Sequence, residues 1–492
     1  MDKIPKLLEK STATTQSSAS RKLGLPLLSA IIFASMVGGG AFNLPQNMAH
    51  GAGLKAVTIA WVITFTGMFF LSAAFRALVD KRPDLKAGIY SYAREGFGLF
   101  AGFEMAWGYW LAAVFGNVAF AFLLVKTAAY FFPPLATQNS WPSMTAISAL
   151  IWVMHFIALS GVRRAAVLNL LSSTLNIVMM VIALGFLALA FDADVFVGNW
   201  GGMQARLGGL SDQVKSTMLV TLWVFIGIEG AVVVSGRAAR SADVGRATLI
   251  SLIVCTGLYF LISVLPFGLM RQGALAGLAT PSLAYVLERA AGEWGMHFML
   301  SALLISLLSS WLSWTILTAE LPHEGAKDGV FPRFLAQQNR HHAAVPALWV
   351  SSVTMQLVVI VTLFAEDAWM WLISMTGVMI LPSYLASTAF LWRLARQTET
   401  VGCYGKGPSW SLCVGVSGTA YALWLLYAAG LQFLLLSTIL YAFGVPVFWW
   451  ARRERASDQA AFSSREKMAV ALLGLLAVGA VVFIVFGFLS LG

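Results

Sequence analysis

Long apolar stretches follow one another along the whole chain, and they restrict its fold more than any other feature of the sequence. Because a helix rises about 1.5 Å per residue, about 20 apolar residues cross a hydrocarbon core roughly 30 Å thick. About thirteen stretches reach or approach that length: 25–48, 56–79, 99–132, 145–160, 166–191, 214–236, 246–270, 293–319, 345–364, 369–394, 410–430, 431–450 and 467–490. Only Gly430 divides the eleventh from the twelfth, so about twelve to fourteen spans fit the sequence. The sequence predicts an all-α polytopic membrane protein.

Charged residues are scarce, which agrees with this prediction. Only 11% of the 492 residues are Asp, Glu, Lys or Arg, and 59% are hydrophobic, whereas about 25% of the residues of a soluble protein are charged. These proportions exclude a soluble enzyme and a disordered chain. Residues 1–22 are rich in Ser and Thr and lack a signal-peptide cleavage pattern. We expect them to form a disordered cytoplasmic tail.

Positive charges are distributed unequally between the two sets of alternating loops. Of the 32 Lys and Arg residues, 26 fall at the N-terminus and in the loops that would share its side. The opposite set holds only Lys55, Arg206, Lys215, Arg271 and Arg289. Since Lys and Arg remain on the cytoplasmic side of a membrane, the sequence predicts a cytoplasmic N-terminus. The net charge of +10 is then an orientation signal, and we expect no nucleic-acid partner.

Two spans are interrupted by glycine at corresponding positions. The first span contains Gly38, Gly39 and Gly40, and the sixth contains Gly227 and Gly230. Each glycine inside a helix costs about 1 kcal/mol relative to alanine, although close helix packing could explain one such site. Interruptions in both the first and the sixth span favour two inverted repeats with a binding site between them. A broken helix offers N–H and C=O groups, which suit the carboxylate and ammonium groups of an amino acid.

Five stretches carry a family resemblance. They are MVGGGAFNLPQNMA (36–49), AGIYSYAREGFG (87–98), WGYWLAAVFGN (107–117), LVTLWVFIGIEGA (219–231) and LSWTILTAELPHEGAKDGVFP (312–332). With them the chain resembles the amino acid–polyamine–organocation transporters, and within these the basic amino acid/polyamine antiporters, most closely the arginine/ornithine exchangers. The resemblance implies a transport core over 23–396, with repeats of about 23–191 and 214–396. Additional transmembrane helices would follow over 410–490.

The resemblance also implies a backbone binding site at the two interruptions. N–H groups of the first one would bind the substrate carboxylate, and carbonyl groups at both would accept hydrogen bonds from its α-ammonium group. The residues concerned are Gly39 and Gly40 for the carboxylate, and Met36, Trp223 and Ile226 for the ammonium, with Gly38 as a further substrate-binding residue. The family's serine in the first interruption is Gly39 here, which removes a hydroxyl group.

Side chains would complete the site. By the resemblance, Trp314 faces the cationic head of the substrate, Asn117 gives a polar contact and Thr376 lies near the substrate. Tyr109 corresponds to an outer gate and Trp223 to a middle gate. An indole face attracts a guanidinium or ammonium group without placing a counter-charge in the pore.

Three carboxylates need separate consideration. Glu229 lies inside the sixth span, where a carboxylate costs about 2.5–3.5 kcal/mol on insertion scales, so we expect a gate hydrogen-bond acceptor or a proton-linked group. Glu320, at the cytoplasmic end of the eighth span, is either a solvated helix end or a charge that helps to select basic substrates. We expect Glu104 to be a salt-bridge partner near the cytoplasm.

The expected function is exchange of a cationic amino acid for a related cation by alternating access, with arginine for ornithine as the first pair. Arginine for agmatine, lysine for cadaverine and histidine for histamine remain open, as does proton-coupled or facilitative uptake. A channel or a sensor is an alternative from another class. The sequence shows no enzyme constellation, cofactor motif or metal-ligand spacing. Expected partners are the substrates, the lipid of the cell inner membrane and, by the resemblance, a second copy in a homodimer.

Overall fold

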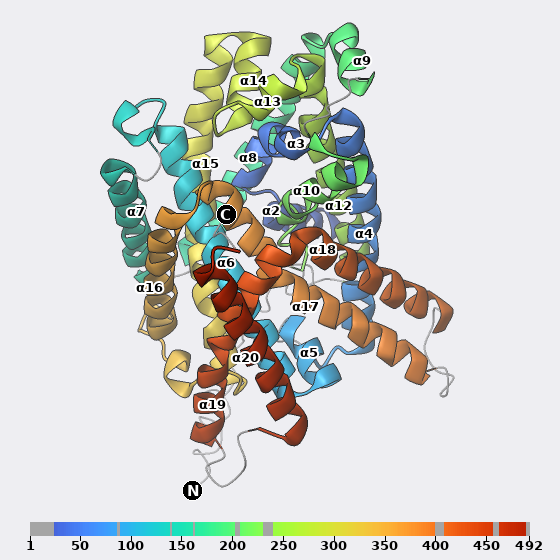
Figure 1. The fold of residues 1–492 in the computed structure, drawn as a ribbon, viewed down its shortest axis with the longest axis vertical. Coiled ribbons are helices and arrows are strands. Elements are labelled where there is room, and N and C mark those ends of the chain that lie inside the picture. The colour runs from blue at the N-terminus through green and yellow to red at the C-terminus, as the bar shows by residue number, and fades with distance from the viewer. Residues whose placement is uncertain are drawn as a thin grey trace, which may run out of the picture.

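A computed structural model gives the arrangement of most of the chain. The structure describes residues 24–85, 89–137, 140–160, 163–201, 207–229, 240–398, 408–455 and 462–488. The tail predicted over 1–22 lies outside these ranges. Within them the regular structure is entirely helical (Figure 1), so the all-α prediction is confirmed.

The helices follow the predicted apolar stretches closely. Their bounds are α2 (Leu25–Met36), η1 (Gly39–Asn43), α3 (Leu44–Gly51), α4 (Leu54–Lys81), α5 (Ile89–Phe97), α6 (Leu99–Ala128), η2 (Pro133–Leu135), α7 (Trp141–Leu159), α8 (Arg163–Leu189), α9 (Ala193–Gly201), α10 (Leu210–Trp223), α12 (Ser241–Val264), η5 (Leu265–Gly268), α13 (Gln272–Ala276), α14 (Ser282–Ala291), α15 (Glu293–Lys327), η6 (Arg333–Ala336), α16 (Val345–Val361), η7 (Thr362–Phe364), α17 (Ala368–Thr398), α18 (Pro408–Ala442), α19 (Gly444–Arg455) and α20 (Ser464–Val485). In Figure 1, α9, α13 and α14 lie at the upper end of the bundle, and α5 and α19 at the lower end.

The number of membrane-length helices depends on the interruptions. Among the described residues, 9 helices are long and apolar enough to cross a membrane, or 10 if the bent pair Thr174–Leu189 and Ala193–Trp200 is one span. The first and sixth predicted spans are absent from this set because α2 has 12 residues and α10 has 14. Gly430, with φ 80° and ψ 155°, divides α18 into two helices. The split predicted at this glycine is therefore present.

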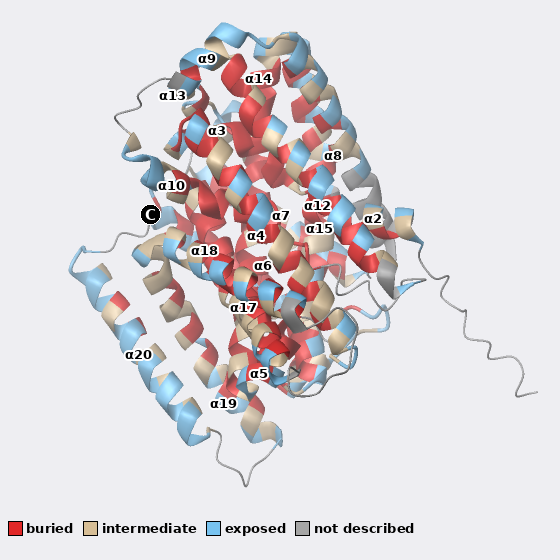
Figure 2. Cartoon of the chain, turned by 90° about the vertical axis from the view of Figure 1, so that its right-hand side faces the viewer, coloured by how far each residue is buried: buried red, intermediate tan, exposed pale blue. Residues whose placement is uncertain are grey.

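α6 is the central helix of the bundle. It contacts both α15 and α17. In its apolar 18-residue stretch, 89% of the residues are buried. Its sequence is predominantly apolar, as expected for a helix that is largely buried. Figure 2 shows buried residues gathered in the middle of the bundle, whereas α20 lies at the side and is mostly exposed. α20 is therefore a peripheral helix.

The C-terminal helices attach to the core at the lower end of α6. Phe448 of α19 packs edge-on against Phe100, with ring centroids 5.2 Å apart. Glu466 in the first turn of α20 forms a capping box with Ser463 and also accepts the Phe100 N–H at 3.3 Å. One carboxylate thus satisfies free N–H groups at the start of two helices, where negative charge is favourable.

Glu104 of α6 differs from its expected role. Its side chain is 6% exposed, and neither carboxyl oxygen has a hydrogen-bond partner within the described part of the chain. No ion pair of Glu104 occurs among those residues either. The expected salt bridge is wrong because α6 carries Glu104 into the packed interior, away from the surface where the chain places its Lys and Arg residues.

Candidate substrate site

The first interruption separates two short helices. α2 ends at Met36, Val37 has φ −80° and ψ 95°, and Gly38 is fully extended with φ −113° and ψ −177°. The chain resumes as the 3-10 helix η1 at Gly39. Three consecutive glycines, which favour the helix least after proline, explain why the span breaks at this point.

The second interruption follows Trp223, where α10 ends. Turns replace the helix over 224–229, and Ile226 donates its N–H to Trp223 O, three residues earlier, at 3.2 Å. Gly227 has φ +113°, and a Cβ there would lie 2.1 Å from Ser35 O. Only glycine avoids both the strained backbone and this clash. Gly230 lies outside the described residues.

The two interruptions touch each other. Ser35 in the last turn of α2 directs its Oγ to Gly227 O at 2.9 Å and to Ile32 O at 2.7 Å. The indole ring of Trp223 lies so close to Gly40 that a Cβ on Gly40 would be 2.0 Å from the ring. The broken helices therefore meet backbone to backbone at Gly227 and Ser35, and through the Trp223 ring at Gly40.

A cavity lies beside this contact. It measures about 50 Å³, enough for several waters at about 10–15 Å³ each. Most of the residues predicted from the sequence line it, namely Met36, Gly38, Gly40, Tyr109, Trp223, Ile226, Trp314 and Thr376. Residues that sequence reasoning missed also line it, among them Ser35, Phe120 and Tyr259.

The lining carries no formal charge among the described residues. Its polar groups are hydroxyls and the backbone groups of the interruptions, and its largest side chains are aromatic. Two of these are the indoles of Trp223 and Trp314, and ring faces attract cations. Such a cavity can hold a cation through ring faces and carbonyl dipoles, without a carboxylate in contact with it.

Gly39 and Asn117 lie outside the cavity lining. A Cβ on Gly39 would point at Leu307 and Leu123, at 2.4 and 2.8 Å. Asn117 is fully buried and donates to Ala113 O at 2.7 Å and to Thr318 Oγ1 at 2.8 Å. In this structure, Asn117 thus links α6 to α15.

Glu229 is the centre of a buried hydrogen-bond cluster. Its carboxylate accepts from Tyr109 at 2.7 Å, from Tyr384 at 2.8 Å and from the Gly227 N–H at 3.1 Å. These donors join α6 and α17 to the second interruption. Glu229 is thus a hydrogen-bond acceptor in this structure, and its part in a gate stays a prediction. Tyr384 has no signal in the sequence, because nothing in its local pattern points to a carboxylate 155 residues away.

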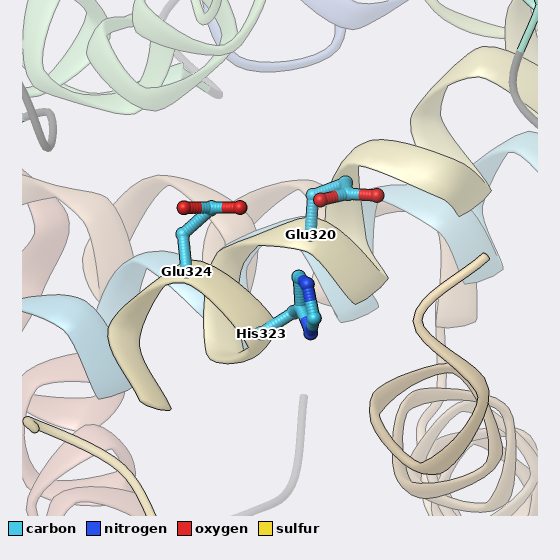
Figure 3. A group of neighbouring side chains, drawn as sticks. All are labelled: Glu320, His323 and Glu324. Carbon is cyan, nitrogen blue, oxygen red and sulfur yellow. The ribbon is translucent and has the colours of Figure 1, made fainter. Parts of the chain in front are cut away.

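Glu320, His323 and Glu324 come together at the lower end of α15 (Figure 3). Their ligand atoms lie within 4.8 Å of one another. However, the His323 ring nitrogens contact Leu335 O at 2.9 Å and Gln338 Nε2 at 2.7 Å. Lys327 pairs with Glu324 at 2.8 Å. Since protein groups hold both His323 nitrogens, this cluster needs no ion.

Comparisons with known proteins give relatives along almost the whole chain. A family model described as amino acid permease matches residues 23–478. The arginine/agmatine antiporter of Chlamydia pneumoniae is 42% identical over 476 residues, covering 95% of this chain and 98% of the relative. That of Chlamydia caviae is 42% identical over 475 residues, covering 95% and 97%. That of Chlamydia trachomatis serovar L2 is 41% identical over 462 residues, covering 93% and 96%.

The two buried glutamates should respond in opposite ways to the same substitution. Glu229→Met leaves three donors without their acceptor, and each buried unpaired group costs about 1–3 kcal/mol. Glu104→Met removes a carboxyl group that has no partner, so we expect unchanged or higher stability. Thermal unfolding of the purified full chain in one detergent measures both. Equal losses for the two variants would show that Glu104 has a partner after all.

Proposed function

The chain belongs to the amino acid permease family, and from this premise we propose that it is an antiporter of cationic amino acids. The first pair to test is arginine and agmatine, because the most similar relatives described above carry that name. Arginine and ornithine, the pair expected from the sequence, is the competing proposal. The cell inner membrane is the proposed location, with the lower end of the bundle facing the cytoplasm.

The uncharged cavity is the observation that supports exchange of an amino acid for its amine. Agmatine is arginine without the carboxylate. A site that held the carboxylate with a buried Arg or Lys would leave that charge unpaired when the amine bound, at a high energetic cost. Among the residues that the structure describes, the lining has no such side chain. Backbone N–H groups are neutral, so leaving them without a hydrogen-bond partner costs less free energy. Arginine and agmatine can therefore bind at the same site.

The substrate would lie along the two interruptions. We propose that the N–H groups of the Gly38–Gly40 stretch bind the carboxylate, and that the carbonyls of Met36 and Ile226 accept hydrogen bonds from the α-ammonium group. The Trp314 ring, which also lines the cavity, would face the guanidinium. Trp223 covers the first interruption at Gly40 and packs against Trp369 with ring centroids 5.5 Å apart, which suits a gate. Its displacement would open the cavity.

Two groups at the ends of the site would control access. The Tyr109–Glu229–Tyr384 cluster joins three elements that must separate if α6 and α17 move relative to the second interruption. Glu320 is half-buried near the lower end of α15, where a negative charge would attract a cation arriving from the cytoplasm. A homodimer remains a prediction of the resemblance.

Counterflow in proteoliposomes tests the proposed exchange. Vesicles containing the full chain are loaded with agmatine, ornithine, arginine or buffer, and uptake of external labelled arginine is measured. We expect rapid uptake only into loaded vesicles, with agmatine at least as effective as ornithine. Uptake at full rate into empty vesicles would replace the antiporter with a facilitative permease. Uptake into empty vesicles only under a proton gradient would indicate a symporter.

Membrane potential distinguishes the two substrate pairs. Agmatine carries two positive charges and arginine one, so arginine entry in exchange for agmatine moves one positive charge out of the vesicle. An inside-positive potential, set with potassium and valinomycin, should therefore accelerate this exchange. Arginine and ornithine carry the same net charge, and their exchange should not respond.

Trp314→Leu tests the contact with the cationic head. Loss of a cation–π contact of about 0.5–2 kcal/mol corresponds to roughly a 2- to 30-fold weaker affinity. We expect this loss for arginine and little change for citrulline, which has a neutral urea group in place of the guanidinium. Trp294→Leu is the matched control, because Trp294 lies on the same helix and is 62% exposed. An unchanged ratio of arginine to citrulline affinity would remove Trp314 from the site.

A further inference from the structure

Tyr259 of α12 is a lining residue of the cavity to which the resemblance gives no role. Its side chain is fully buried, and it lies on the cavity wall beside the first interruption. Its hydroxyl donates to Met36 O at 3.0 Å. The ring is held by Phe225, edge-on at 5.6 Å, and by Trp61 at 6.3 Å. The hydroxyl is thus fixed next to the carbonyl proposed for the α-ammonium group.

The interruption itself makes this hydrogen bond possible. Met36 is the last residue of α2, and the last carbonyls of a helix have no N–H partner within that helix. Tyr259 satisfies one lone pair of Met36 O and leaves the second free, since a backbone carbonyl has two. The hydrogen bond therefore stabilises the end of α2, and Met36 O can still accept a second hydrogen bond from a ligand.

The direction of this hydrogen bond determines what the wall can bind. A phenol has one proton, and Tyr259 uses it on Met36 O. Its oxygen can then only accept a hydrogen bond from the cavity. Two acceptors, Tyr259 Oη and Met36 O, stand 3.0 Å apart on the lining. An ammonium group has several N–H donors and can reach both, whereas a carboxylate has none to give.

We propose that Tyr259 is a further substrate-positioning residue whose hydroxyl oxygen accepts an N–H from the α-ammonium group, alongside the Met36 carbonyl. This inference rests on the proposed function and deepens it. This hydrogen bond would orient the substrate, because the ammonium group would bind at α12 and the carboxylate at the N–H groups of the first interruption. Arginine and agmatine both carry this ammonium group, so Tyr259 would serve both directions of exchange.

Ligands that keep the guanidinium group of arginine but lack either its α-carboxylate or its α-amino group test this role. The purified full chain is compared with Tyr259→Phe by equilibrium binding of arginine, agmatine and 5-guanidinopentanoate, which is arginine without its α-amino group. Hydrogen bonds to charged groups are strong, so we expect arginine and agmatine to bind roughly tenfold or more weakly to the variant. 5-Guanidinopentanoate, measured as a competitor at millimolar concentration, should change less than about twofold.

Tyr441→Phe is the matched control. Tyr441 is also buried and donates its hydroxyl proton to a backbone carbonyl, Met379 O, at 2.9 Å, but it does not line the cavity. We expect it to leave all three affinities unchanged. The ring of Tyr259→Phe keeps its packing, and retained binding of 5-guanidinopentanoate shows that the variant is folded.

The outcomes separate the two proposals. An equal loss for all three ligands in Tyr259→Phe would make Tyr259 a structural support only, and no loss for any ligand would place the ammonium group elsewhere; either result overturns the inference. If the unaltered chain binds neither arginine nor agmatine, the proposed function fails, and this inference fails with it.

Discussion

The contact between the two broken helices is the constraint on which the rest of the site depends. Gly227 meets the backbone of Ser35 so closely that no side chain fits between them, and the Ser35 hydroxyl bonds to Gly227 O. This contact places the free backbone groups of both interruptions at one cavity. A hydrocarbon core tolerates irregular backbone only where it is buried in protein or lines a cavity, and the two interruptions meet both conditions, since they pack against each other and line the cavity.

An uncharged cavity suits a protein that must both bind and release a cation. A fixed carboxylate would hold a cationic cargo tightly, and a fixed arginine would select for carboxylates only. Ring faces and carbonyl dipoles bind more weakly, and they lose little when one cargo replaces another. Glu229 accepts hydrogen bonds from the lining residue Tyr109, from Tyr384 and from the Gly227 N–H. These hydrogen bonds connect Glu229 to α6, α17 and the second interruption.

Local features of the sequence were enough to predict the spans and both interruptions. The length of an apolar stretch determines where a helix can cross the membrane, and glycine determines where that helix is interrupted. Neither feature depends on residues far away in the sequence. The orientation of neighbouring residues was less predictable. Gly40 faces Trp223, whereas Gly39 faces Leu307 and Leu123, because the 3-10 helix η1 rotates successive residues to different sides. Tyr259 was missed because its partner, Met36, is 223 residues away and no local pattern records that contact.

The two buried glutamates show why residue type alone is insufficient inside a membrane. Glu229 and Glu104 are both carboxylates among apolar residues, and the cost of burial is similar for each. Their partners differ because a broken helix exposes a backbone N–H to Glu229 and leaves room for two tyrosines, whereas the regular helix around Glu104 uses its own N–H groups. An interruption thus supplies donors for a nearby carboxylate as well as dipoles for a cargo. Gly38 and Gly40 of the first interruption line the cavity, and Gly227 of the second donates its N–H to Glu229, the carboxylate that joins α6, α17 and the second interruption in the described part of the chain.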